Sequence, residues 1–257
     1  SEHSDKVTVE VKGPSSETAF DEMQNMIETD LSSGSYDGIV ISPLQSDTAA
    51  QLVSGTKLPI VAIDTNFTAP EVKSFVGTGN EAAAKAAGWT DIKCIEIAGV
   101  QGDQTNTARM NGYKAGVEEA GGTFLSDEVQ YADATADRAT TAMEAIMQTH
   151  PEGIAIICAN NDDMAMAAAR AAQGHDAYKN TIFLGFNGDR AACEAILAGQ
   201  MTMSVAQMAY EMGYKAVETM VQVLDGETVD EFVDSGSDVV TPDNAQERLD
   251  TLKTQLH

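Results

Sequence analysis

Six apolar segments of this chain each end on polar residues at the point where a β-strand would give way to a loop or a helix. In chain order, the polar residues at these ends are Ser42, Asp64, Gln101 to Asp103, Asn161, Asn187 and Gln207. In an open parallel α/β sheet, ligands bind beyond the carboxyl ends of the strands. The pattern therefore predicts a group of binding side chains at these ends.

Strand-like and helix-like segments alternate along the whole chain, which is the pattern of β-α-β units and of a largely parallel sheet. The predicted strands cover residues 7–11, 38–41, 59–63, 74–76, 94–98, a segment around 129, 154–157, 182–185 and 239–240. The predicted helices cover residues 17–31, a segment after 47, 81–87, 108–120, 138–147, 163–172, 190–197, a segment after 207 and the C-terminal segment. Because 257 residues exceed the usual size of one hydrophobic core, we expect two lobes.

Composition excludes several classes of function. Forty acidic and fifteen basic residues give a formal net charge of -25, which repels a phosphate backbone, so we expect no nucleic-acid ligand. No run of eighteen apolar residues is present, so no membrane-crossing segment is predicted. The three cysteines and four histidines have neither disulfide-framework nor metal-site spacing. The segment SEHSDK is unlike a signal peptide, so we expect that any export signal has already been removed or was never there.

One motif favours an enzyme. Residues 77–82 fit G-x-G-x-x-A between a predicted strand and a predicted helix, and Glu96 follows at a distance suited to a ribose hydroxyl. A dinucleotide site normally opens its lobe, whereas this motif follows three strand signals. We therefore expect no cofactor and no enzyme, and the sequence shows no nucleophile elbow or phosphate-binding loop. We interpret Asp162 and Asp163 as helix-starting anions that favour the positive end of a helix dipole.

A series of short motifs carries a family resemblance. In order they are DGIVISPLQSD, LPIVAIDTNF, FVGTGNEAA, ARMNGYKAGVEEAGG, CANNDDMAMAAARA, FLGFNGD, SVAQMAYEMGYKAVE and DVVTPDN. From about Val7 to Asn244 the chain resembles the type I periplasmic binding proteins of sugar importers, the group similar to ribose-binding protein. The resemblance implies an α/β fold of two Rossmann-like lobes with parallel sheets flanked by helices, joined by three crossovers and closing by hinge motion. The implied lobes are residues 1–89 plus 208–238 and residues 90–207 plus 239–257.

The resemblance also implies ligand-binding positions. The family's strand-end and hinge groups fall on Asp64, Asn161, Asn187 and Gln207, and three further positions fall on Thr65, Thr107 and Arg109. Asp, Asn and Gln suit a sugar because its hydroxyl groups both donate and accept hydrogen bonds. Thr65 and Thr107 stand where ribose-binding protein has arginine, and Ala136 stands where it has an aromatic residue. These departures favour a hexose, a polyol or a furanose over ribose.

The beginning of the chain departs further from the family. Relatives open with a strand, a turn bearing aromatic residues and a helix, whereas this chain begins where that helix should be ending. We expect either a truncated sequence or another segment in place of that strand. The helix after Asn80 is also short, and we interpret Trp89 as a surface or hinge residue.

These observations together predict an exported, periplasmic or membrane-anchored lipoprotein receptor. We expect it to bind a monosaccharide or polyol between the lobes, without a cofactor or a metal, and to deliver it as a monomer to the membrane permease of an ABC importer. The alternative is the ligand-binding domain of a transcription regulator of the lactose-repressor type, which has the same fold and would need a DNA-binding helix-turn-helix.

Overall fold

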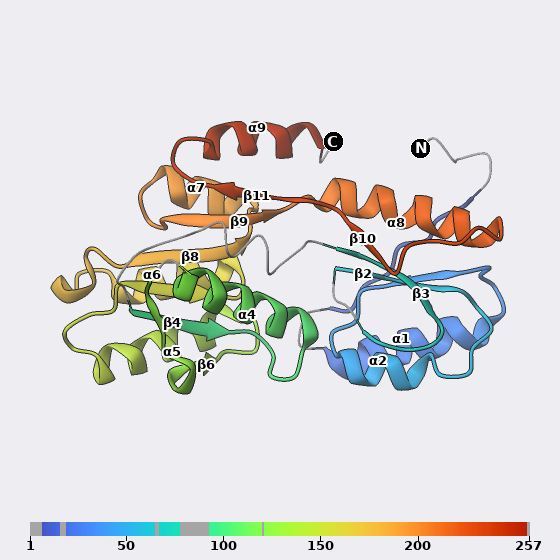
Figure 1. Cartoon of the computed structure of the whole chain (residues 1–257), viewed down its shortest axis with the longest axis horizontal. Helices are drawn as coiled ribbons and strands as arrows, with labels where there is room; N and C mark the ends of the chain where they lie inside the picture. The colour runs from blue at the N-terminus through green and yellow to red at the C-terminus, as the bar shows by residue number, and fades with distance from the viewer. Residues whose placement is uncertain (1–6, 16–18, 65–66, 78–92, 120, 256–257) are drawn as a thin grey trace. The chain divides into compact units, whose positions relative to one another are not determined.

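A computed structural model describes residues 7–15, 19–64, 67–77, 93–119 and 121–255 (Figure 1). Contacts divide the chain into two compact units. Unit 1 comprises Ser1–Gly77 and Ala209–Ser235, and unit 2 comprises Thr78–Met208 and Gly236–His257. The chain therefore passes between the units three times. The predicted helix 81–87, Trp89 and the lobe boundary at residue 89 lie outside the described residues.

Unit 1 is built on a parallel sheet. Its strand order is β1 (Ile39–Ile41), β2 (Ile60–Ile63), β3 (Val72–Gly77) and β10 (Phe232–Asp234). Successive side chains of a strand point to opposite faces, and β2 is apolar throughout because both of its faces are covered. Ile60 and Ala62 pack in the cluster of α1 (Phe20–Ser33) and α2 (Ser46–Leu52), whereas Val61 packs against α8 (Ala209–Leu224) (Figure 1).

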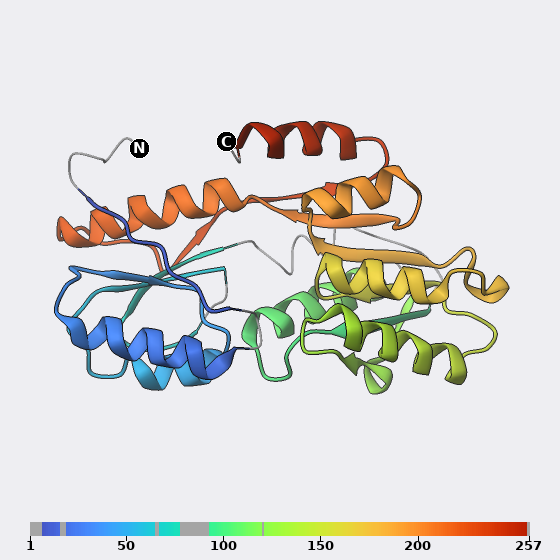
Figure 2. The ribbon, with the colours of Figure 1, turned by 180° about the vertical axis from the view of Figure 1, so that it is seen from behind.

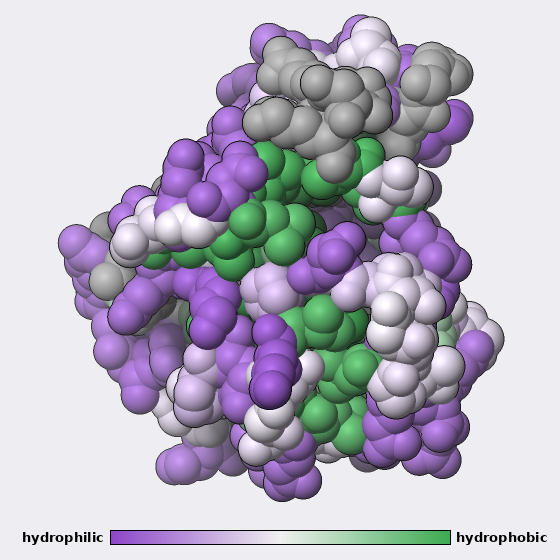
Figure 3. Space-filling model, turned by 90° about the vertical axis from the view of Figure 1, so that its right-hand side faces the viewer, coloured by the Kyte–Doolittle hydropathy of each residue, from purple (hydrophilic) through white to green (hydrophobic). Residues whose placement is uncertain are grey.

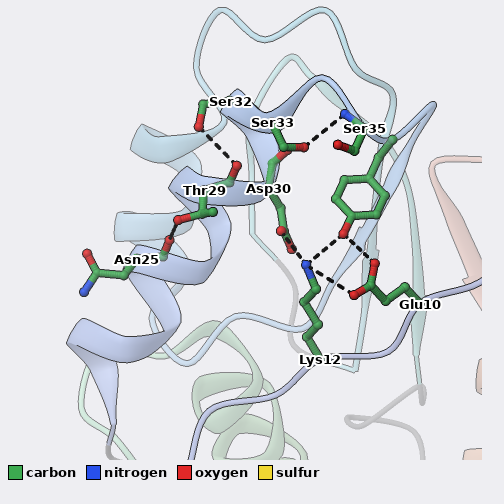
Figure 4. Close-up of polar contacts among 9 residues, drawn as sticks. Glu10, Lys12, Asn25, Thr29, Asp30, Ser32, Ser33 and Ser35 are labelled. Carbon is green, nitrogen blue, oxygen red and sulfur yellow. Dashed lines mark hydrogen bonds and ion pairs between the residues drawn. The ribbon is translucent and has the colours of Figure 1, made fainter.

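The predicted strand at residues 7–11 is wrong, because the described part of the chain places no strand there. The segment is held by side chains instead. Lys12 Nζ donates to Asp30 Oδ1 and to the Tyr36 hydroxyl, each at 2.7 Å, and the Tyr36 hydroxyl donates to Glu10 at 2.6 Å (Figure 4). The alternating valines match a strand, but a strand also requires a neighbour with which to pair.

This segment crosses unit 1 on the side seen in Figure 2 and leaves apolar side chains at the surface. Val9 is 59% exposed, Val11 is 88% exposed, and Val40 of the edge strand β1 is 37% exposed. Figure 3, which faces the right-hand side of Figure 1, shows apolar surface among polar patches on that face. Unit 1 thus leaves several apolar side chains exposed to solvent.

Unit 2 holds a larger sheet with the order β11-β9-β8-β7-β4-β5, and β6 also pairs with β4. The pairs β4–β7, β7–β8 and β8–β9 are parallel, and only the edge strand β11 runs antiparallel in the described sheet. The strands are β4 (Lys93–Ala98), β5 (Thr123–Phe124), β6 (Gln130–Tyr131), β7 (Ile156–Ala159), β8 (Ile182–Asn187), β9 (Met203–Gln207) and β11 (Ser237–Val240). The helices are α4 (Gln104–Glu119), α5 (Ala136–Thr149), α6 (Asp162–Ala172), α7 (Arg190–Leu197) and α9 (Ala245–Gln255).

Two apolar clusters lie on the opposite faces of this sheet. Alternation along β4 sends Ile95 and Ile97 into the cluster of α5, α6, α7 and α9, and sends Cys94 into the cluster of α4. The same alternation turns Glu96 toward the α4 face. The core of unit 2 therefore contains a carboxyl group at a position where the strand pattern calls for an apolar side chain.

Glu96 is fully buried, and neither carboxyl oxygen has a hydrogen-bond partner among the described residues. It lies opposite Cys158 in the register of β4 and β7. Burial raises the pKa of Glu96 from 4.5 to about 8, against the opposing effect of the nearby Arg109 charge. At neutral pH the side chain is therefore mostly uncharged.

This raised pKa has a consequence for stability. A folded-state pKa above the unfolded value means that the folded state holds the proton to higher pH, so the contribution of Glu96 to the free energy of unfolding falls as pH rises from 4.5 to about 8. Glu96→Gln removes this titration. Across this pH window we expect the free energy of unfolding of the wild type to fall by on the order of 4 kcal/mol relative to that of Glu96→Gln. One unit of pKa difference corresponds to about 1.4 kcal/mol.

Urea unfolding of both proteins between pH 5 and pH 9 measures this difference. Glu119→Gln, on the exposed end of α4, is the matched control and should follow the wild type. Parallel stability curves for wild type and Glu96→Gln would contradict the prediction.

Candidate functional site

The predicted polar residues of unit 2 gather at one edge of its sheet. Asn161 follows β7, Asn187 ends β8 and Gln207 ends β9. These three strands are neighbours and run parallel, so their carboxyl ends meet at the same edge. The structure thereby brings together three side chains that are 26 and 20 residues apart along the chain.

Asn187 and Gln207 form a direct pair. Gln207 Nε2 donates to Asn187 Oδ1 at 2.8 Å, and both residues are partly exposed. Arg248 of α9 holds the backbone beneath them, since its guanidinium donates to the Gly188 carbonyl at 3.1 Å and to the Gln207 carbonyl at 2.7 Å. The pair is therefore fixed before any ligand arrives, which lowers the entropy cost of binding.

Asn161 caps α6. Its Oδ1 accepts a hydrogen bond from the Met164 amide at 2.9 Å, and its Nδ2 donates to the Ala134 carbonyl at 3.1 Å. The residue is 8% exposed. The side chain thus has a capping role, and the ligand contact predicted for it remains a prediction.

Thr107 and Arg109 lie in the first turns of α4 but in different surroundings. Thr107 is exposed and its hydroxyl donates to the Asp103 carbonyl at 2.8 Å. Arg109 is buried, donates to the Asn160 carbonyl at 3.0 Å and lies 4.1 Å from the centre of the Phe186 ring. The Arg109 guanidinium is therefore bound inside the protein, where it supports Asn160, the residue before Asn161.

Sequence reasoning missed two buried amides at this edge. Asn160 Nδ2 donates to Asn106 Oδ1 at 2.8 Å, and that oxygen also accepts from the Gly99 amide at 2.6 Å. A Cβ at Gly99 would come within 2.9 Å of Asn160 Oδ1, so a glycine is needed there. The sequence does show polar residues after β4 and β7, which could have pointed to these two amides. Their pairing, however, depends on the register of the sheet.

Asp64 belongs to unit 1 and follows β2. Its backbone φ is 61°, in the left-handed region that aspartate tolerates better than most residues other than glycine. Thr65 lies outside the described residues. Unit 1 thus presents its predicted carboxylate on a sharp turn at the carboxyl end of a buried strand.

The described part of the chain contains no group of three His, Cys, Asp or Glu residues placed to hold a metal ion. No helix among the described residues has the length and apolar character of a membrane span. Residues 78–82 of the G-x-G-x-x-A motif lie outside the described residues. Glu96, which that motif would pair with a ribose hydroxyl, is fully buried in the sheet.

Amide and hydroxyl groups at the carboxyl edge of a parallel sheet, in an α/β chain that passes three times between two units, define a small-molecule receptor of the type I periplasmic class. Residues 1–228 match the periplasmic binding protein domain family, and the chain belongs to that family. The predicted α/β fold class is confirmed.

Individual relatives agree with this membership. The chain is 29% identical over 202 residues to the ribose import binding protein of Escherichia coli strain K12, covering 74% of this chain and 67% of the relative. It is 29% identical over 235 residues to the D-allose-binding periplasmic protein of the same strain, covering 84% and 74%. A solute-binding protein of an ABC transporter from Mycobacterium smegmatis, solved with bound glycerol, superposes with a TM-score of 0.75 at 27% identity, covering 89% and 82%.

The two hydrogen bonds of Asn161 predict how substitutions change stability. Asn161→Ala removes the helix cap and the bond to Ala134, and should lower the free energy of unfolding by about 2 kcal/mol. Asn161→Ser keeps a capping oxygen and should lose about half as much. Urea unfolding at neutral pH measures both. Equal losses in the two variants would show that capping is not the stabilising role of Asn161.

Proposed function

We propose that this chain is an extracytoplasmic receptor that captures a monosaccharide or a related polyol and delivers it to the membrane permease of an ABC importer. The observation that carries the proposal is the fixed Asn187–Gln207 pair at the carboxyl edge of the unit 2 sheet. Amide side chains both donate and accept, as a ligand rich in hydroxyl groups requires. The relatives described above are named as import or periplasmic binding proteins, which favours this function over transcription regulation.

The charges at the edge favour an uncharged ligand. Arg109 directs its guanidinium to a backbone carbonyl and an aromatic ring, and Arg248 directs its own to two backbone carbonyls. Because both guanidinium groups already bind groups of the protein itself, neither requires an anionic ligand. Asp64 of unit 1 adds a carboxylate, which can accept charge-assisted hydrogen bonds from sugar hydroxyls.

The residues proposed to bind the ligand occur in both units. We propose that the ligand touches Asp64, Thr65, Thr107, Asn161, Asn187 and Gln207, while Arg109 supports the site through Asn160. In this function the chain catalyses no reaction and needs no cofactor. We further propose that it acts as a monomer outside the cytoplasm, where a membrane anchor would keep it close to the permease.

A thermal-shift screen tests the function. The panel contains D-ribose, D-allose, D-galactose, D-galactofuranosides, myo-inositol and linear polyols, with NAD as the control for a dinucleotide enzyme. A ligand at about a thousand times its Kd stabilises the folded state by about 4 kcal/mol, which raises the Tm by several degrees for a chain of this size. A shift with NAD alone would overturn the proposal.

Asp64→Ala tests the site. Removing a carboxylate that binds hydroxyl groups should weaken binding of the panel sugar with the largest shift by about 2 to 5 kcal/mol, because the hydroxyls lose a charged partner. Asp37→Ala, at an exposed position in unit 1, is the matched control. Isothermal titration calorimetry measures both. Unchanged affinity in Asp64→Ala would remove Asp64 from the site.

A further inference from the structure

Asp162 joins the three elements next to which Asn161, Asn187 and Gln207 lie. It is the first residue of α6, directly after Asn161, and it is fully buried. Its Oδ2 accepts hydrogen bonds from the Gly188 amide at 2.8 Å and the Asp189 amide at 3.2 Å. Its Oδ1 accepts from the Ser204 hydroxyl at 2.6 Å. One carboxylate thus links α6, the turn after β8 and strand β9.

The turn that Asp162 holds has an unusual backbone. Asn187 has a φ of 133° and Gly188 a φ of 63°, and a Cβ at Gly188 would collide with Ala206. A φ of 133° is rare for a residue other than glycine, so the Asn187 conformation persists only where the surroundings hold it. The Ser204 hydroxyl lies 3.0 Å from the Gly188 amide and strengthens the same anchor. The position of the Asn187 side chain therefore depends on the hydrogen bonds made to residues 188 and 189.

The sheet makes room for this carboxylate at a cost. A Cβ at Gly185 of β8 would collide with Oδ1 of Asp162. Burial raises the pKa of Asp162 to about 7, and the charge of Asp189 acts in the same direction, while the hydrogen bonds from Ser204 and the two amides lower it. An apolar or amide side chain would avoid the desolvation cost of a buried carboxylate. A buried carboxylate therefore stabilises the fold less than such a side chain would, which indicates a role beyond supporting the fold.

We propose that Asp162 is a positioning residue for ligand binding: it holds the turn of residues 187–189 so that Asn187 and Gln207 keep the geometry that receives the ligand. The inference rests on the proposed function for its final step. It adds to the interpretation of Asp162 as a helix-starting anion, because the carboxylate turns inward to the turn after β8 and to β9. Its neighbour Asp163 is the exposed member of the pair.

Three variants separate positioning from folding. Asp162→Ala removes all three hydrogen bonds. Asp162→Asn can keep them, with its oxygen accepting from the two amides and its nitrogen donating to Ser204, so it should rescue the function. Asp163→Asn is the matched control in the same helical turn.

The first measurement needs no sugar. Hydrogen–deuterium exchange is followed in peptides that cover residues 185–192 and, for comparison, residues 138–147 of α5. In Asp162→Ala we expect exchange at residues 188 and 189 to quicken about tenfold, with α5 unchanged. Asp162→Asn and Asp163→Asn should match the wild type. Unchanged exchange at residues 188 and 189 in Asp162→Ala would overturn the inference.

The second measurement is the affinity for the panel sugar with the largest thermal shift, taken well below the Tm of each variant. We expect Asp162→Ala to bind at least tenfold more weakly and Asp162→Asn to bind within about threefold of the wild type. Wild-type affinity in Asp162→Ala, despite faster exchange, would show that the residue acts only on the fold and would overturn the inference.

Ser204→Ala decides the matter if Asp162→Ala does not fold. It removes the two hydrogen bonds of the Ser204 hydroxyl, to Asp162 and from the Gly188 amide, and leaves the carboxylate in place. Exchange at residue 188 should therefore quicken and affinity should fall by a smaller factor. Wild-type behaviour in both would overturn the inference. If the wild type binds no sugar, the proposed function fails, and the exchange result still decides whether Asp162 holds the turn.

Discussion

The parallel register of β7, β8 and β9 is the constraint on which the rest of unit 2 depends. Parallel pairing brings the ends of the three strands to one edge, so that Asn161, Asn187 and Gln207 become neighbours. A slip of one residue would turn each strand over, exchange its inward and outward side chains, and separate the Asn187–Gln207 pair. The apolar strand residues fix this register because both faces of the sheet are buried.

Polar groups inside unit 2 follow from the same constraint. Helix α4 brings Arg109 and Asn106 to Asn160, and α6 brings Asp162 to the turn after β8. Each such group costs free energy when it leaves water, and the cost is offset only where hydrogen bonds are complete. Asp162 has three donors that favour its charged form, and burial still raises its pKa to about 7. Glu96 has no hydrogen-bond partner among the described residues, and burial raises its pKa to about 8.

Local signals predicted those elements whose sequence and surroundings agree. Residues 190–197 were predicted as a helix and are one, because Asp189 supplies a capping oxygen to the Ala192 amide just before an apolar helical pattern. Residues 7–11 were wrongly predicted as a strand, because valine alternation signals a pleated surface but supplies no partner. The short strand Phe232–Asp234 was missed, because it has no apolar run of its own and pairs with β3 from far along the chain.

By itself the sequence determined the α/β class, the strand ends that carry polar residues and the family, since these depend on local periodicity and on the order of motifs. Only the tertiary structure decided which contacts those polar residues make within the protein. Asn161 caps a helix, Arg109 is buried beneath Asn160, and Asp162 turns inward to hold the turn of Asn187. Adjacent residues such as Asp162 and Asp163 look alike in sequence, and they differ because burial and hydrogen-bond partners come from strands that are distant in the chain.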